Sequence, residues 1–187
     1  MRDELEKARK ILREGGVILY PTDTIWGLGC DATLPSAVER IYHIKKRSDT
    51  KSMLVLVDEA ARVADYVEEV PPIAEQLVAV ADTPLTIVYP GARNLATNLV
   101  NTDGSIGIRV TTDPFCKELI REFRKPIVST SANLSGQPSP GNFDEIPEEI
   151  RRQVDYVVNW RQDEVTKAKP SSIIKLGLKG EIEILRK

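Results

Sequence analysis

The stretch SIGIRVTTDPFCKELIREFRKPIVST (residues 105–130) decides the fold. Its first six residues alternate between apolar side chains and small or polar ones, which is typical of a β-strand. An Asp-Pro step then begins a predicted helix that runs over about 112–124, and an apolar strand follows at 126–130. Strand, helix and strand in succession predict an α/β fold, in which helices pack on a sheet.

The same alternation continues in both directions from this stretch. No repeat and no linker long enough to separate a second domain interrupts it, so we expect one domain over residues 1–187. The C-terminal pair of strands predicts a hairpin, which makes the sheet mixed rather than purely parallel. Further helices are predicted at 2–14, at 35–46, after Pro71–Pro72, near 145–153, and after Asp58, which is expected to cap a short helix. Further strands are predicted at 17–20, 53–57, 84–89, 156–158 and on both sides of Gly180. A polar loop is predicted at 21–34.

Composition excludes several classes of protein. The chain has 187 residues, 41% of them hydrophobic, and a net charge of −2, which is unlike a strongly basic nucleic-acid binder. Its two cysteines fit no metal or disulfide spacing, so we expect a reducing, cytoplasmic setting. No apolar run is long enough to cross a membrane, and the charged N-terminus is unlike a signal peptide.

A cluster of cations, Lys45-Lys46-Arg47 with Lys51, follows one predicted helix. Cations at a helix C-terminus offset the helix dipole, which accounts for the first two. Arg47 and Lys51 fall beyond the helix, in a polar turn before a strand, where they suit a polyphosphate. These residues alone leave two interpretations: cations that only offset the helix dipole, or a binding site for an anion.

The strand at 105–110 presents one face that is a poor core face. Ser105, Gly107 and Arg109 share it, whereas isoleucines and a valine occupy the other. A hydroxyl, a bare backbone and a guanidinium make a good floor for a ligand, because glycine permits close approach. The alternative is an edge strand with Arg109 in water.

Hydroxyl and amide side chains follow several predicted strands. They lie at Thr22–Thr24 and at Ser129–Asn133, and Ser171–Ser172 opens a later strand. Strand ends are where α/β folds place ligands, although such residues also favour turns. No phosphate-binding GxxxxGK[ST] loop and no GxSxG elbow occurs. The single histidine, His43, falls within a predicted helix, where a surface or core-edge position is the default.

Three of these segments, in this order and at these distances, resemble the YrdC-like domain family. They are Pro21-Thr22-Asp23-Thr24-Ile25-Trp26-Gly27-Leu28-Gly29, Lys45-Lys46-Arg47 and Ser129-Thr130-Ser131-Ala132-Asn133. The match runs from about Gly15 to the C-terminus and resembles the single-domain bacterial form of the family. It implies a twisted mixed sheet flanked by helices, with a concave basic face.

The resemblance also implies an activity, that of an L-threonylcarbamoyladenylate synthase. This nucleotidyltransferase joins L-threonine, bicarbonate and ATP and releases pyrophosphate, the first step of t6A modification at position 37 of tRNA. Lys45 and Arg47 are then expected to be catalytic. The implied ATP-binding residues are Arg47, Lys51, Ser105, Asn133 and Arg186, and the implied threonine-binding residues are Thr24, Arg109, Ser131 and Ser171.

No carboxylate cluster resembles a dedicated metal site, so we expect Mg²⁺ to arrive with ATP. The expected partners are ATP, L-threonine, bicarbonate and the downstream t6A transferase proteins, with tRNA or double-stranded RNA as a possible ligand and no membrane. Two other readings stay open. One is an RNA-binding translation or ribosome factor, against which the 5% aromatic content counts. The other is a YrdC-like paralogue that acts on another carbamoyl-type substrate.

Overall fold

The structure, a computed structural model, describes residues 1–46 and 53–187. The predicted alternation of helices and strands is confirmed along these residues, with most boundaries shifted by one or two positions. In chain order the elements are α1 (Arg2–Arg13), β1 (Ile18–Tyr20), β2 (Gly27–Gly29), α2 (Pro35–Ile44), β3 (Leu54–Val57), the 3₁₀ helix η1 (Ala60–Asp65), α3 (Ala74–Val80), β4 (Leu85–Tyr89), β5 (Ile106–Val110), α4 (Pro114–Phe123), β6 (Ile127–Ser131), α5 (Glu148–Arg151), β7 (Tyr156–Val157), β8 (Ser172–Leu176) and β9 (Ile182–Arg186).

All the described strands join one mixed sheet in the order β7-β1-β2-β6-β3-β5-β4-β8-β9. The pairs β1–β7, β3–β5 and β4–β8 are parallel, and the other neighbours are antiparallel. Mixed pairing therefore extends through the whole sheet, beyond the C-terminal hairpin that predicted it. The order places β6, β3, β5 and β4 at the centre, so residues far apart in sequence become neighbours there.

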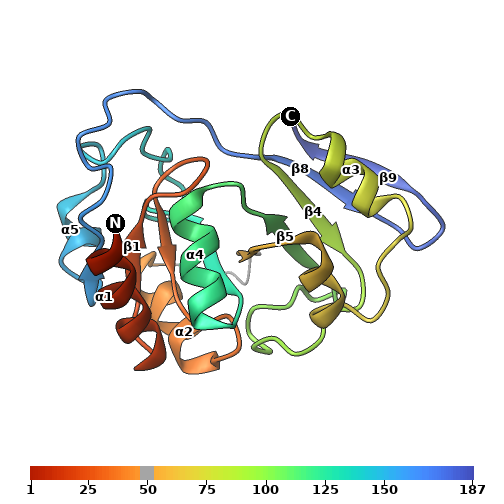
Figure 1. The fold of residues 1–187 in the computed structure, drawn as a ribbon, viewed down its shortest axis with the longest axis horizontal. Helices are drawn as coiled ribbons and strands as arrows, with labels where there is room; N and C mark the ends of the chain where they lie inside the picture. Colours follow the sequence, from red (N-terminus) through yellow and green to blue (C-terminus); the bar gives the residue numbers. More distant parts are fainter. Residues whose placement is uncertain (47–52) are drawn as a thin grey trace.

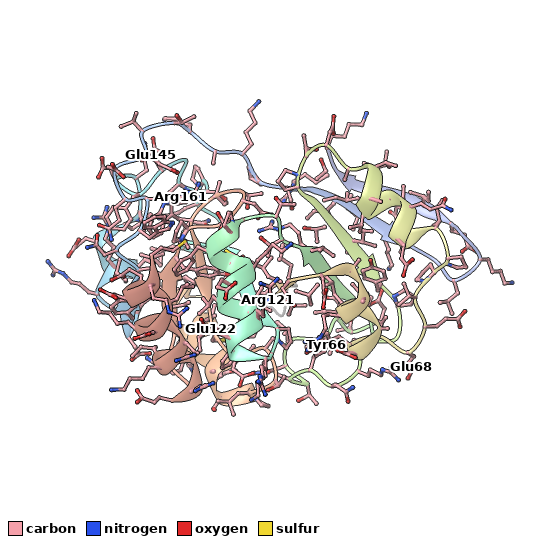
Figure 2. The ribbon with its side chains drawn as sticks, in the orientation of Figure 1. Tyr66, Glu68, Arg121, Glu122, Glu145 and Arg161 are labelled. Carbon is pink, nitrogen blue, oxygen red and sulfur yellow. The ribbon has the colours of Figure 1, made fainter. Side chains whose placement is uncertain are left out.

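Apolar side chains pack against both faces of the sheet and form one layer on each. On one face, α1 and α4 pack over β1 and β3 through Leu5, Leu119 and Leu56 (Figure 1). Glu122 strengthens this layer, because its carboxylate accepts a hydrogen bond from Arg9 of α1 at 2.8 Å (Figure 2). The opposite face buries α2 against residues such as Val55. The helices α1 and α4 lie over the half of the sheet that contains β1 (Figure 1). The strands β5, β4 and β8 belong to the other half.

The start of α4 confirms the helix predicted to begin at the Asp-Pro step. The Asp113 carboxylate accepts a hydrogen bond from the backbone N–H of Cys116 at 2.8 Å, and Pro114 occupies the first turn. The predicted cap at Asp58 is wrong, since η1 begins after Glu59 without a side-chain cap, and Asp58 lies before that residue.

The expectation of a loop over 21–34 is also wrong in part. Gly27–Gly29 forms β2, which pairs with β1 and β6. Glycine is required here by close approach, because a Cβ on Gly29 would lie 2.5 Å from a ring carbon of Tyr20. A strand of glycines carries little of the apolar alternation by which strands are predicted.

Within residues 1–46 and 53–187, no helix has both the length and the apolar character needed to cross a lipid bilayer.

Candidate active site

A cavity of about 310 Å³ lies on the face of the sheet that carries Gly107 and Arg109 of β5. Its floor consists of residues from several adjacent rows on one face of neighbouring strands. Gly27 pairs with Ser131, Leu54 pairs with both Ser129 and Gly107, and Thr86 pairs with Arg109. Paired residues point to the same face of a sheet, so these side chains reach the cavity together. The strand face predicted as a ligand floor therefore faces the cavity at Gly107 and Arg109, which both line it.

Arg109 is the charged group at the centre of this floor. It is 2% exposed, and its Nη2 atom lies 3.0 Å from Oδ1 of Asp23. The ion pair is close but poorly aligned, because within residues 1–46 and 53–187 Nε and Nη2 of Arg109 donate no hydrogen bond and Oδ1 of Asp23 accepts none. A buried guanidinium with unused donors beside a cavity is suited to bind an anion, and in particular a carboxylate.

A second guanidinium, that of Arg186, lines the same cavity from β9. Its Nε donates to the backbone carbonyl of Ser171 at 2.8 Å, and the Ser171 hydroxyl shares a hydrogen bond of 2.8 Å with Thr86. Burial, followed by repulsion from Arg109, lowers the pKa of Arg186. Two cations that repel each other across one cavity favour a negatively charged ligand between them.

Hydroxyl and aromatic groups form the opposite wall. Thr24 and Ser131 both line the cavity, and the Thr24 hydroxyl shares a hydrogen bond of 3.0 Å with Thr22. Trp26 lies beside them, its ring centroid 4.8 Å from that of Phe143. The wall thus offers polar groups for orientation on an apolar support, as small-molecule sites do.

Five predicted site residues therefore meet around one cavity: Thr24, Arg109, Ser131, Ser171 and Arg186. Four of these were expected at threonine and one at ATP. The short distances between them come from sheet registry, since they lie on five different segments of the chain.

Three other predicted site residues lie outside the lining of this cavity. Ser105 is buried in a turn, where its hydroxyl donates to Asp103 at 2.6 Å. Asn133 is buried at the end of β6, and its amide donates to the carbonyls of Leu134 and Gln137. Both side chains are engaged in local hydrogen bonds that shape their turns, so their proposed contact with nucleotide stays a prediction.

Lys45 is the third. It is 3% exposed, and its ammonium donates to the backbone carbonyls of Ser131 and Asn133, at 2.5 and 2.7 Å. It thereby joins the end of α2 to the end of β6, next to the cavity wall. The structure gives Lys45 a supporting position, and its predicted catalytic role stays a prediction.

Arg47 and Lys51 lie outside the described residues. Among the cavity-lining residues that the structure does describe, the charged side chains are Arg109 and Arg186, both cations. Within the same described residues, no group of three or more histidine, cysteine or acidic side chains could hold a metal ion. His43 is exposed on α2, 3.4 Å from Glu39, away from the cavity.

Sequence reasoning missed Thr86. It lies beside Arg109 in the sheet and bonds to Ser171. The available signal was one hydroxyl within the apolar strand PLTIVY, but strand order decides whether such a residue meets a site.

The fold and this site place the chain in a class of proteins built on one mixed sheet, with a cavity lined by cationic and hydroxyl side chains on one face. The family model described as "Telomere recombination", that of the Sua5, YciO and YrdC proteins, matches residues 10–187. The chain therefore belongs to this family, and the predicted YrdC-like identity is confirmed.

Relatives of known name agree with this placement. The chain is 38% identical over 151 residues to the threonylcarbamoyl-AMP synthase of Pseudoalteromonas translucida, covering 79% of this chain and 81% of the relative. It is 35% identical over 162 residues to the synthase of Vibrio cholerae, covering 85% and 86%.

Two solved structures share the fold. E. coli YciO superposes with a TM-score of 0.85 at 26% identity, covering 100% of this chain and 90% of that protein. P. abyssi Sua5 in complex with L-threonine superposes with a TM-score of 0.82 at 25% identity, covering 92% of this chain. The chain spans 50% of the length of that Sua5 protein.

Proposed function

We propose that this protein is a threonylcarbamoyl-AMP synthase. It joins L-threonine, bicarbonate and ATP into threonylcarbamoyl-adenylate and releases pyrophosphate, the first step of t6A synthesis in tRNA. The observation that carries the proposal is the cavity itself, in which the buried guanidinium of Arg109 and the more exposed one of Arg186 share a lining with the Thr24 and Ser131 hydroxyls. Family membership and the names of the relatives support the same reaction.

The substrate amino acid binds on the floor. Its carboxylate meets Arg109, whose Nε and Nη2 donate no hydrogen bond to any residue that the structure describes. The hydroxyls of Thr24 and Ser131 orient the rest of the molecule, with Ser171 behind them. Such orientation supplies much of the catalysis when two reactants must meet in line.

Two bonds are then made in order. The free amine of threonine attacks the carbon of bicarbonate and water leaves, which gives a carbamate. A carbamate oxygen next attacks the α-phosphorus of ATP, the bond from that phosphorus to the bridging oxygen breaks, and pyrophosphate departs. Both steps gather negative charge, so fixed cations in a site shielded from water stabilise them.

Arg186 supplies one such cation from the cavity edge. Arg47 and Lys51 are proposed to hold the ATP phosphates, and Mg²⁺ to arrive bound to those phosphates and to water. The downstream t6A transferase proteins and tRNA are proposed partners, because a mixed anhydride of this kind must pass its carbamoyl group to an acceptor.

The test is pyrophosphate release by the purified protein with ATP, Mg²⁺ and bicarbonate, measured with and without L-threonine. We expect release that depends on threonine. Release that ignores threonine would assign the site to another acceptor, and no release would favour the RNA-binding reading or an inactive paralogue.

A further inference from the structure

Asp23 lies beside the cavity without lining it. Its side chain is 5% exposed and comes from the loop between β1 and β2, next to Thr24. One carboxylate oxygen, Oδ1, lies 3.0 Å from Nη2 of Arg109. The other, Oδ2, accepts hydrogen bonds of 3.3 Å from the Thr111 hydroxyl and from the backbone N–H of Thr112.

These contacts make Asp23 a brace between two segments. Thr111 and Thr112 follow directly on β5, the strand that carries Arg109, so the carboxylate is fixed to the same strand end as the guanidinium it faces. Among the described residues, no acceptor is hydrogen-bonded to Nε or Nη2 of Arg109. Within that part of the chain, the ion pair with Asp23 is therefore the polar contact recorded at this edge of the guanidinium.

Asp23 also sets the charge of the cavity. Arg109 and Arg186 repel each other, and no acidic side chain is among the described residues that line the cavity. With Asp23 present, one of the two positive charges is offset.

We infer that Asp23 is a positioning residue, whose carboxylate fixes the guanidinium of Arg109 in the orientation that receives the carboxylate of the amino-acid substrate. The inference rests on the proposed function. It assigns Asp23 a role in selecting the amino acid and none in binding the phosphates, since its contacts are with β5 and the turn after it.

The test is a comparison of KM values in the pyrophosphate assay. Asp23→Asn keeps the size of the side chain and removes its charge. We expect the KM for threonine to rise at least tenfold while the KM for ATP stays within twofold of the wild type. A merely structural loss would raise both values or lower only the amount of folded protein.

Two further variants sharpen the test. Asp58→Asn is the matched control, because Asp58 is also a buried aspartate with an oxygen that no described residue hydrogen-bonds, but it neither lines the cavity nor pairs with Arg109, and both KM values should stay unchanged. Thr111→Val removes one hydrogen bond to Asp23 and keeps its charge. It should raise the KM for threonine by about threefold, and it decides the matter if Asp23→Asn does not fold.

A double-mutant cycle gives the final readout. In an Arg109→Lys background the guanidinium is gone, so Asp23→Asn should add less than a twofold change to the KM for threonine. Equal changes in both KM values, a full additional effect in the Arg109→Lys background, or the same shift in Asp58→Asn would overturn the inference. If the wild type itself shows no threonine-dependent release, the proposed function fails instead.

Discussion

The ammonium group of Lys45, at the end of α2, lies 2.7 Å from the backbone carbonyl of Asn133, beyond the end of β6. A second carbonyl, that of Ser131, shares the same ammonium. One buried cation thus fixes the strand end whose side chains face the cavity.

Replacing this lysine should therefore weaken the fold. Lys45→Met leaves two carbonyls without their charged donor, and we expect a loss of about 3 kcal/mol in the free energy of unfolding. For a chain of this size that corresponds to a melting temperature roughly 6–12 °C lower, measurable by calorimetry.

Lys46→Met is the control for this change. Lys46 is an exposed neighbour whose ammonium pairs with Glu149, and surface pairs contribute less than about 1 kcal/mol. An unchanged melting temperature in Lys45→Met, together with lost turnover, would return Lys45 to a direct catalytic role.

Gly107 permits a graded test of the cavity floor. A Cβ there would meet Thr86 and Leu54 at 3.4 and 3.5 Å, which is ordinary van der Waals contact. Gly107→Ala should accordingly fold normally, with a melting temperature within about 3 °C of the wild type, and lose part of its threonine-dependent turnover. Gly107→Leu fills the cavity and should lose turnover at least a hundredfold.

Circular dichroism and the pyrophosphate assay together check these two variants. Full activity in Gly107→Leu, with the fold intact, would show that substrate does not use this floor.

Asp103 gives the fold a defined dependence on pH. Hydrogen bonds from Lys175 and Ser105 lower the pKa of this carboxyl from 3.8 to about 2. Because the folded pKa is the lower one, the carboxylate stabilises the fold above pH 3.8, and this contribution is lost as the pH falls towards 2. The melting temperature of the wild type should thus exceed that of Asp103→Asn above pH 4, and the two should converge near pH 2. A constant difference across this range would show that Asp103 acts through something other than its charge.

Much of the fold could be predicted from periodicity and turn residues. The strand at 105–110 and the helix begun by Asp113 stand where the sequence placed them. β2 was missed, because its two glycines are needed for close contact with Tyr20 and β6. Those contacts are made by residues on other strands, so no local pattern predicts them. Strand order is a tertiary property, so the antiparallel pairing of β3 with β6 could not be predicted from local sequence.

The site shows the same division. Arg109 could be predicted because strand alternation placed it on a face unsuited to a core. Ser105 shares that alternation, but the strand begins after it and its hydroxyl turns to Asp103. Lys45 belongs to a basic cluster in sequence, yet burial turns its ammonium towards carbonyls rather than towards a ligand. Charge and hydroxyl content indicated the kind of site, whereas the direction of each side chain depended on packing.

Labelled bicarbonate tests the central claim most directly. The purified protein is mixed with ATP, Mg²⁺, L-threonine and ¹³C-bicarbonate. The nucleotide products are separated, and their masses are determined by mass spectrometry. We predict a labelled product that contains threonine, the bicarbonate carbon and AMP, formed in step with pyrophosphate and absent when threonine is left out. Pyrophosphate release without that labelled nucleotide would contradict the assignment of this cavity to threonylcarbamoyl-adenylate synthesis.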